Sequence, residues 1–260
     1  IVFLHGSEDH YMVNNPSRLY KYLGIKNKYH NLLLEARRCI SVSFFLKQKF
    51  ISKTRFLDIN DKITVIRNSV NEQKLIGLTS KTDPFKQVRK DGNKILFSAS
   101  RIVKMKGYNK MFKIFKEVLK NGGKFKWIIA GEGEFKEELI GLVNKNNLEK
   151  DILFLGGIER DKIFQYYYYS DLFWLLSEFE EGLGLVYLES ALCGTKVIGN
   201  NLGGVKEVVS NKTGWLTNSE EEVKIILLNQ QNFIYSKELV VESAKELNVD
   251  NKHLIIEYLI

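Results

Sequence analysis

From residue 94 onward, short runs rich in β-branched and aromatic residues alternate with longer amphipathic runs, and this alternation strongly constrains the fold. Each short run is apolar on both faces, as strands buried in a parallel sheet are. Strands that alternate with helices predict a parallel sheet with helices on both faces, which is an α/β domain of the Rossmann-like type. The predicted strands are Lys94–Ala99, Phe125–Ala130, Asp151–Leu155, Asp171–Leu176 and Lys196–Gly199.

The first 75 residues show the same pattern in a shorter form. Strand-like runs at Ile1–Leu4, Cys39–Ser43 and Lys62–Arg67 are separated by helical stretches. Residues 1–75 are predicted to form a partial N-terminal Rossmann-like domain, because a common domain has ~100–150 residues. Since the chain starts inside a predicted strand, we expect this domain to be truncated. The other predicted parts are a polar linker with Pro84 (76–92), a C-terminal ligand-binding domain (93–240) and a C-terminal helix (241–260).

The composition is that of an ordinary globular protein. Hydrophobic residues make up 44% of the chain and charged residues 27%, and no apolar run approaches the roughly 18–20 residues of a membrane span. Cys39 and Cys193 lie far apart in apolar surroundings, which favours reduced core residues in a cytoplasmic protein. The net charge of +8 favours an anionic partner: a phosphorylated small molecule, an anionic membrane surface or nucleic acid.

The segment from Ser177 to Gly194 contains the most informative motif. A predicted strand ends near Ser177, a glycine-containing loop follows, and a helix is predicted to begin near Gly184. Glycines let backbone N–H groups approach a ligand, and the first turn of a helix leaves its N–H groups unpaired. This combination favours the binding of an anionic group such as a phosphate.

Glu189 lies inside that predicted helix, on the same face as Leu185 and Leu192. A carboxylate on a core-facing stripe is costly unless it has a strong partner. The paired hydroxyls of a ribose would be such a partner, and a buried arginine or a backbone amide would be another.

Arg101 and Lys106 flank a short loop after the first strand of the C-terminal domain. Ligands of α/β domains bind at this edge of the sheet, and the two cations could jointly neutralise a diphosphate. Two cations in one loop are also common on solvated surfaces.

Two glycine pairs follow other predicted strands. Gly131 and Gly133 resemble the start of a dinucleotide fingerprint, but Lys136 occupies the place of its third glycine, which argues against a nicotinamide cofactor. Gly203 and Gly204 open another predicted helix, where they would either add backbone donors or form a tight turn.

Taken together, these motifs resemble family-4 glycosyltransferases of the GT-B fold. Glu181 and Glu189 match the paired glutamates of that family, and Arg101 with Lys106 matches its basic pair. Gly131, Gly203–Gly204 and Thr213–Leu216 follow in the order of the family. The resemblance extends from the linker to the C-terminus and, more loosely, over residues 1–70. It implies an α/β fold of two Rossmann-like domains with parallel sheets, here with the first domain incomplete.

The resemblance also implies roles for single residues. Arg101 and Lys106 would hold the diphosphate of the donor, and Glu189 would hold its ribose. Glu181 would be the catalytic residue beside the reacting carbon of the transferred sugar, either as nucleophile or as positioning group. Further candidates are the strand-end His5 and, near the nucleobase, Gly156. Backbone amides of Gly182, Leu183, Gly184 and Leu185 would complete the cradle for the sugar and the phosphates.

The implied reaction is the transfer of a sugar, with retention, from a nucleoside diphosphate sugar to a glycan or lipid-linked acceptor, as in polysaccharide or lipopolysaccharide biosynthesis. The sequence has no Asp-x-Asp motif for a divalent cation, so we expect metal-independent chemistry with no cofactor beyond the nucleotide sugar. In a truncated chain the acceptor site would be incomplete and activity would be in doubt.

Two other functions fit parts of the sequence. A nucleotide-sugar epimerase would use the same two-domain fold, and the positive charge alone would suit a nucleic-acid-binding module. The lysines are scattered and no nucleic-acid motif is recognised, so we expect no nucleic-acid partner.

The expected location is cytoplasmic, with peripheral contact to the anionic inner face of the membrane, where lipid-linked acceptors lie.

Overall fold

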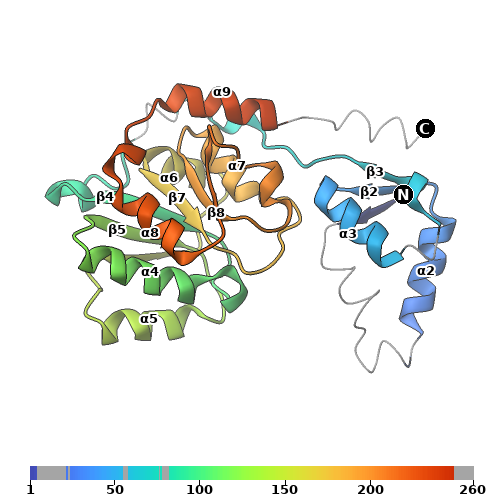
Figure 1. The fold of residues 1–260 in the computed structure, drawn as a ribbon, viewed down its shortest axis with the longest axis horizontal. Helices are drawn as coiled ribbons and strands as arrows, with labels where there is room; N and C mark the ends of the chain where they lie inside the picture. Colours follow the sequence, from blue (N-terminus) through green and yellow to red (C-terminus); the bar gives the residue numbers. More distant parts are fainter. Residues whose placement is uncertain (5–21, 23, 55–57, 76, 78–81, 249–260) are drawn as a thin grey trace.

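The structure is a computed structural model that describes residues 1–4, 22, 24–54, 58–75, 77 and 82–248. Two parallel sheets organise these residues, one of three strands and one of six. Figure 1 shows a small unit with the first sheet and a larger unit with the second. This arrangement agrees with the two Rossmann-like domains expected from the alternating pattern.

The larger unit is built on a sheet in which every pair of neighbouring strands is parallel. The strand order is β6-β5-β4-β7-β8-β9, so the chain moves outward from β4 first in one direction and then in the other. The carboxyl ends of all these strands meet at one edge, where the two directions diverge between β4 and β7. The strands are β4 (Lys94–Ala99), β5 (Phe125–Ala130), β6 (Ile152–Gly156), β7 (Leu172–Leu175), β8 (Val197–Asn200) and β9 (Gly214–Thr217).

The predicted strands match β4 and β5 residue for residue and match β6, β7 and β8 with small shifts at the ends. The sequence pattern missed β9, the last strand of the sheet. This strand contains a glycine and a threonine and is only partly buried, so it lacks the continuous apolar run that marks the inner strands.

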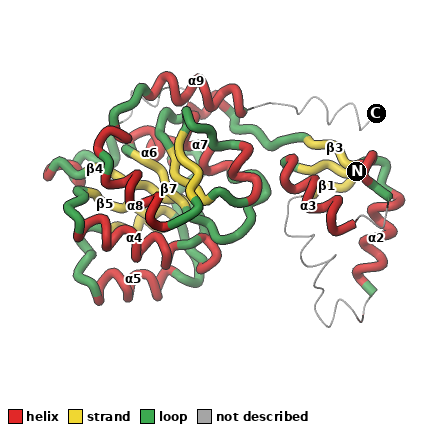
Figure 2. Tube along the Cα trace, in the orientation of Figure 1, coloured by secondary structure: helices red, strands yellow, loops and turns green. Residues whose placement is uncertain are grey.

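Helices cover both faces of the six-stranded sheet (Figures 1 and 2). One face carries α4 (Tyr108–Lys120), α5 (Lys136–Lys145) and α8 (Glu220–Leu228), and α4 contacts α8. The other face carries α6 (Ile163–Tyr169), α7 (Leu185–Leu192) and α9 (Lys237–Leu247), and α7 contacts both neighbours. The helix α9 begins before residue 241, where the C-terminal helix was predicted to start, and residues 249–260 lie outside the described residues.

Large aromatic side chains fill the core beneath these helices. Trp127 and Trp174 are fully buried and pack edge to face at 4.9 Å between ring centroids. Tyr166 stacks on Phe97, and Tyr167 packs against it edge to face, so part of the tyrosine run 166–169 serves packing. Such a rigid core holds the strand ends, and therefore the loops that follow them, in fixed positions.

The smaller unit has a sheet in the order β1 (Val2–Leu4), β2 (Cys39–Ser41) and β3 (Ile63–Val65), all parallel. The helices α2 (Ile25–Glu35) and α3 (Phe44–Thr54) pack against this sheet. Short 3₁₀ turns follow at Asn60–Lys62 and Glu72–Leu75, and the second of them leads toward the larger unit. The unit has an apolar core of its own, so the two sheets belong to separate cores.

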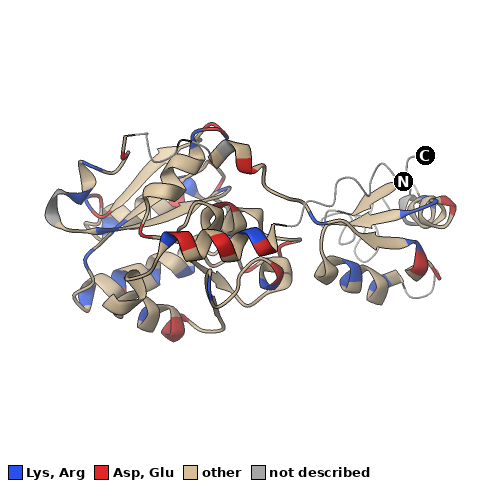
Figure 3. Cartoon of the chain, turned by 90° about the horizontal axis from the view of Figure 1, so that it is seen from above, with Lys and Arg blue, Asp and Glu red and all other residues tan. Residues whose placement is uncertain are grey.

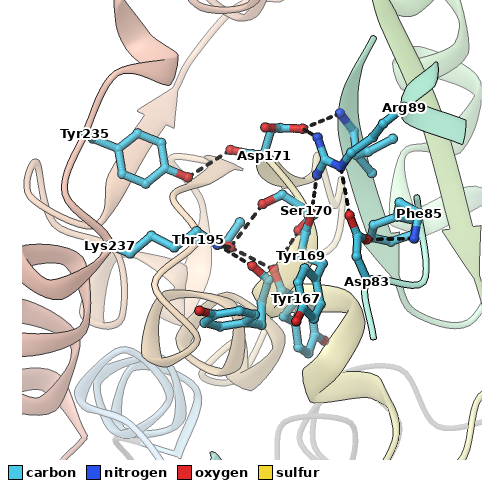
Figure 4. Close-up of polar contacts among 12 residues, drawn as sticks. Asp83, Phe85, Arg89, Tyr167, Tyr169, Ser170, Asp171, Thr195, Tyr235 and Lys237 are labelled. Atoms are coloured by element: carbon cyan, nitrogen blue, oxygen red, sulfur yellow. Dashed lines mark hydrogen bonds and ion pairs between the residues drawn. The ribbon is translucent and has the colours of Figure 1, made fainter. Parts of the chain in front are cut away.

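A polar network at the amino-terminal edge of the large sheet fastens the incoming chain (Figure 4). Asp171 Oδ2 accepts hydrogen bonds of 2.6 Å from Arg89 Nη1 and from the backbone N–H of Ile95, and Arg89 also pairs with Asp83 at 3.4 Å. The hydroxyl of Tyr235 donates to the backbone carbonyl of Asp171 at 2.8 Å, and burial raises the pKa of Tyr235 to about 12. This network lies at the opposite edge from the strand carboxyl ends, so its role is structural.

Polar contacts join the units in the described part of the chain. The Glu207 carboxylate accepts hydrogen bonds from the first N–H groups of α3, and Lys49 on α3 pairs with Glu180 at 3.0 Å. The side chain of Asn248, which follows α9, bonds both the N–H and the carbonyl of Val70, in the segment after β3. These contacts place α3 beside the loops at the carboxyl edge of the large sheet.

Candidate functional site

Two adjoining cavities open at the carboxyl edge of the large sheet. The first, of about 380 Å³, is bounded by the loops after β4, β5 and β6 and by one face of α7. Its charged lining residues include Arg101, Arg160 and Glu189. The residues that line it are Ala99, Ser100, Arg101, Ala130, Gly131, Glu132, Gly157, Ile158, Arg160, Ile163, Tyr167, Val186 and Glu189.

The second cavity, of about 230 Å³, continues from the first toward the smaller unit. Its walls include Lys106, the segment Glu181–Leu185 that opens α7, and Val42 and Asn68 from the smaller unit. Four residues line both cavities, which shows that the two spaces adjoin: Ser100, Arg160, Val186 and Glu189.

Glu189 lies at the junction of the two cavities on the buried face of α7. Its side chain is 3% exposed, and its Oε1 pairs with Arg160 Nη2 at 2.5 Å. The hydroxyl of Tyr167 donates to Oε2 at 3.2 Å. Burial, followed by the nearby Glu189 charge, raises the pKa of Tyr167 well above its usual value, so this hydroxyl remains a donor. The apolar stripe of α7 therefore presents one buried carboxylate to both cavities.

A second ion pair stands in the smaller cavity. Lys106 Nζ lies 2.5 Å from Glu181 Oε1, and both side chains are more than four-fifths buried. Lys106 is held by the tight turn Lys104–Lys106, which ends at Gly107 with φ 78°. A Cβ at Gly107 would lie 2.0 Å from the carbonyl oxygen of Leu176, so the turn can approach β7 only with glycine.

The loop before α7 is fixed by the other glycine pair. The N–H of Gly204 donates to the carbonyl of Glu181 at 2.8 Å, and a Cβ at Gly204 would lie 2.2 Å from the carbonyl oxygen of Gly182. Gly203 has φ 64° and also touches the backbone of Glu181. Of the two functions predicted for this pair, the structure favours the tight turn: its close packing sets the position of Glu181.

The N-terminus of α7 points toward the smaller cavity. Gly184 forms the N-cap with φ 81°, and α7 begins at Leu185, close to the helix start predicted from the sequence. Gly182, Leu183, Gly184 and Leu185 all line this cavity. The first N–H groups of a helix carry partial positive charge, so an anion in this cavity would be stabilised.

The remaining predicted residues fall into three positions. Arg101 is exposed and lines the first cavity with Gly131. Gly156 ends β6, and its carbonyl accepts a hydrogen bond of 2.7 Å from the N–H of Gly131, so it supports the cavity wall without lining it. His5 lies outside the described residues.

Sequence reasoning missed Arg160, the partner of Glu189. The only signal in the sequence was that Arg160 is a cation placed shortly after Gly156, the residue expected near the nucleobase. The partner foreseen as the alternative to a ribose was a buried arginine, whereas the side chain of Arg160 is 67% exposed. Tyr167, Val42 and Asn68 were also missed, since they reach the cavities through tertiary packing alone.

The described residues are 1–4, 22, 24–54, 58–75, 77 and 82–248. Within them, no group of three or more His, Cys, Asp and Glu side chains is arranged to hold a metal ion. None of the helices in the described part of the chain is sufficiently long and apolar to cross a membrane.

Comparison with known proteins agrees with this geometry. The model of the family "Glycosyl transferases group 1" matches residues 79–230, which is more than half of the chain. The chain belongs to this family. Residues 79–230 of this group 1 glycosyltransferase include all of β4 to β9 and therefore the cavity loops of the larger unit.

Curated relatives of this group 1 glycosyltransferase match it over part of their length. The alpha-monoglucosyldiacylglycerol synthase of Streptococcus pneumoniae is 32% identical over 122 residues, which are 47% of this chain and 27% of that protein. The N-acetyl-alpha-D-glucosaminyl L-malate synthase of Bacillus anthracis is 33% identical over 127 residues, which are 48% of this chain and 32% of that protein. The chain thus matches a third or less of each of these two relatives.

Solved structures match nearly the whole chain. Anabaena HepE in complex with UDP and glucose has a TM-score of 0.74 at 22% identity, covering 99% of this chain and 70% of that one. The pneumococcal O-GlcNAc transferase GtfA in complex with UDP and GlcNAc has a TM-score of 0.66 at 20% identity, covering 94% and 48%. These likenesses confirm the predicted GT-B fold with a small first domain.

Proposed function

We propose that this chain binds a nucleoside diphosphate sugar across the two adjoining cavities and transfers the sugar to an acceptor. The observation that carries the proposal is the position of Glu189, a carboxylate that is 3% exposed at the junction of the two spaces. A buried carboxylate at a cavity wall is costly unless polar partners compensate it, and a ribose supplies two hydroxyl donors.

The donor would lie with its nucleoside in the first cavity and its diphosphate near the junction. The nucleobase would lie beside Gly157 and Ile158, and Glu189 would face the ribose. Arg101, Lys106 and the first turn of α7 would surround the diphosphate with positive charge. The sugar would occupy the second cavity beside Glu181. The likeness of the fold to HepE, which was solved with UDP and glucose, supports this placement.

The chemistry follows from where charge would develop. Breaking the bond between the sugar and the diphosphate leaves negative charge on the phosphates, and the cations around the junction would stabilise that charge. The sugar gains positive character at the same time, so the Glu181 carboxylate would stabilise the opposite charge, either as nucleophile or as positioning group. Donor binding would draw Lys106 from Glu181 toward the phosphates, which frees this carboxylate for the sugar. We propose transfer with retention, without a metal.

The acceptor would approach from the side of the smaller unit, where Val42 and Asn68 line the second cavity. We propose a glycan or lipid-linked acceptor. The name of the relative from Streptococcus pneumoniae, a monoglucosyldiacylglycerol synthase, supports the lipid-linked class.

We propose that the enzyme is cytoplasmic and touches an anionic membrane surface peripherally. Figure 3 shows basic residues on many elements of both units, interspersed with acidic ones. On α4, Lys113, Lys116 and Lys120 are exposed and recur at helical spacing. Such residues attract anionic headgroups at low salt. In a co-sedimentation assay, the bound fraction of the protein should rise with the anionic lipid content of the liposomes. A bound fraction that does not depend on this content would exclude the proposed contact with an anionic membrane.

The direct test of the donor proposal is calorimetric titration of the chain with UDP-, GDP- and ADP-sugars. One of the series should bind, and Glu189→Gln should weaken it about tenfold or more, because a charged hydrogen-bond acceptor for the ribose is lost. Glu246→Gln, on the exposed side of α9, is the matched control and should bind as the parent chain does. If none of the nucleotide sugars binds to the folded parent chain, the proposed function is wrong. A bound donor that yields an altered sugar nucleotide without any acceptor would indicate an epimerase.

A further inference from the structure

The ion pair between Arg160 and Glu189 is strongly asymmetric. Glu189 is fixed in α7 and its side chain is 3% exposed, whereas the side chain of Arg160 is 67% exposed. Arg160 follows β6 in a loop segment between Gly156 and the start of α6 at Ile163. A long, largely exposed side chain on a loop can change rotamer on a nanosecond timescale, while a buried carboxylate on a packed helix cannot. The ion pair can therefore be broken by a rotamer change of Arg160, whereas Glu189 stays in place.

The guanidinium of Arg160 also lies near the proposed positions of two donor groups, the ribose and the diphosphate. Arg160 lines the first cavity with Gly157 and Ile158, and it lines the second with Lys106 and Glu181. A rotation of its side chain would therefore keep it within reach of either space. Its present place, 2.5 Å from Glu189 Oε1, is the place that a ribose hydroxyl would take in the proposed donor complex.

We propose that Arg160 occupies the ribose-binding position at Glu189 and exchanges this partner for the donor diphosphate when the donor binds. This inference rests on the proposed function. Before the donor binds, its guanidinium neutralises the buried Glu189 carboxylate. In the complex the ribose hydroxyls replace it on Glu189, and the guanidinium turns to the donor diphosphate as a third cation beside Arg101 and Lys106. In this exchange the Glu189 carboxylate keeps a polar partner both before and after the donor binds, which offsets the cost of its burial.

This exchange makes a distinctive prediction for binding. Arg160 competes with a nucleoside for the Glu189 carboxylate, and a nucleoside has no phosphate that the guanidinium could bind instead. With a nucleoside diphosphate, the displaced guanidinium gains a contact with the phosphates and so strengthens binding. Removal of the side chain should therefore leave the affinity for the nucleoside unchanged or higher, and should lower the affinity for the diphosphate. A merely structural ion pair would not separate these two ligands.

The test is calorimetric titration of the parent chain, Arg160→Ala and Arg160→Lys with uridine and UDP, and with guanosine and GDP in parallel. The ratio of the diphosphate affinity to the nucleoside affinity should fall about tenfold in Arg160→Ala, since a charge-assisted contact is lost. Arg160→Lys, which keeps the charge but not the planar fork, should fall in between. Lys162→Ala, an exposed cation in the same loop that pairs with Glu159, is the matched control and should leave the ratio unchanged.

The titrations distinguish a failure of the proposed donor binding from a failure of the proposed partner exchange of Arg160. If the parent chain binds none of the four ligands, the proposed function fails. If the parent chain binds them and Arg160→Ala leaves the ratio unchanged, or weakens both ligands equally in a protein that melts cooperatively, Arg160 is only a structural partner of Glu189 and the exchange is disproved.

Discussion

The Glu207 carboxylate caps a helix of the other unit: its Oε1 accepts a hydrogen bond of 2.7 Å from the backbone N–H of Phe45. Its Oε2 accepts a second one, of 3.1 Å, from the N–H of Phe44. These are N–H groups of the first turn of α3, which have no partner within the helix. Glu207 ends the 3₁₀ turn Gly203–Glu207, whose glycines pack against the loop of Glu181. One short turn therefore positions Glu181 and holds the smaller unit beside it.

Glu207→Ala should loosen the docking of the two units, because the first turn of α3 loses a charged acceptor that contributes about 1 kcal/mol. Small-angle scattering should show a larger radius of gyration than for the parent chain. Glu242→Ala, on the exposed side of α9, should leave the radius unchanged. Equal radii for the two variants would mean that Glu207 does not hold the units together.

Arg101→Ala should weaken the binding of a nucleoside diphosphate more than that of the nucleoside, by about tenfold in the ratio, because its guanidinium is assigned to the phosphates. Paired titrations with UDP and uridine measure the ratio. Lys104→Ala, which removes an exposed cation in the same loop that pairs with Glu138, is the control. An equal loss for both ligands would remove the diphosphate role of Arg101.

Gly204→Ala should destabilise the chain by about 1–3 kcal/mol, since the added methyl group would lie 2.2 Å from the carbonyl oxygen of Gly182 and force the backbone to shift. Donor binding should weaken as well, because the same shift moves Glu181. Gly141→Ala provides the control: this glycine lies in α5, and a Cβ there meets nothing within 4 Å, so stability should be equal or higher. Thermal and urea unfolding give both values, and an unchanged midpoint for Gly204→Ala would contradict the close packing.

Burial raises the pKa of both thiols, Cys39 and Cys193. A group whose pKa is higher in the folded state stabilises the fold below its unfolded pKa, and this contribution is lost as the pH rises past roughly 8.5. Between pH 7 and pH 9.5, Cys193→Ala should therefore lose about 1 kcal/mol less stability than the parent chain. Equal losses in urea unfolding at the two pH values would contradict the raised pKa.

Alkylation offers an independent check of the same burial. Iodoacetamide should modify the native chain at least about a hundredfold more slowly than the urea-unfolded chain, because each thiol must first be exposed by opening of its surroundings. Rapid modification of Cys193 in the native state would show that the carboxyl end of α7 opens readily.

Local pattern was sufficient to predict much of the larger unit. The apolar runs of β4 and β5 were predicted to the residue because a strand buried on both faces must be continuously apolar. Ser219 and Glu222 stand three residues apart at the start of α8, as in a capping box, and the Ser219 Oγ accepts the N–H of Glu222 at 3.2 Å. The side chain of Glu222 bonds the N–H of Asn218 instead of that of Ser219, a local variation that sequence alone does not resolve.

What the sequence by itself determined is the alternation of strands and helices, the glycine loop before α7 and the presence of one acid, Glu189, on an apolar stripe. Only the tertiary structure decided which side chains meet that acid. Arg160 and Tyr167 are 29 and 22 residues away from it along the chain and reach it because α6 and the loop before it lie beside α7. The pairing of Glu207 with Phe45 spans 162 residues. Periodicity reports only which face of an element is buried, whereas such partners depend on how whole elements are placed in space.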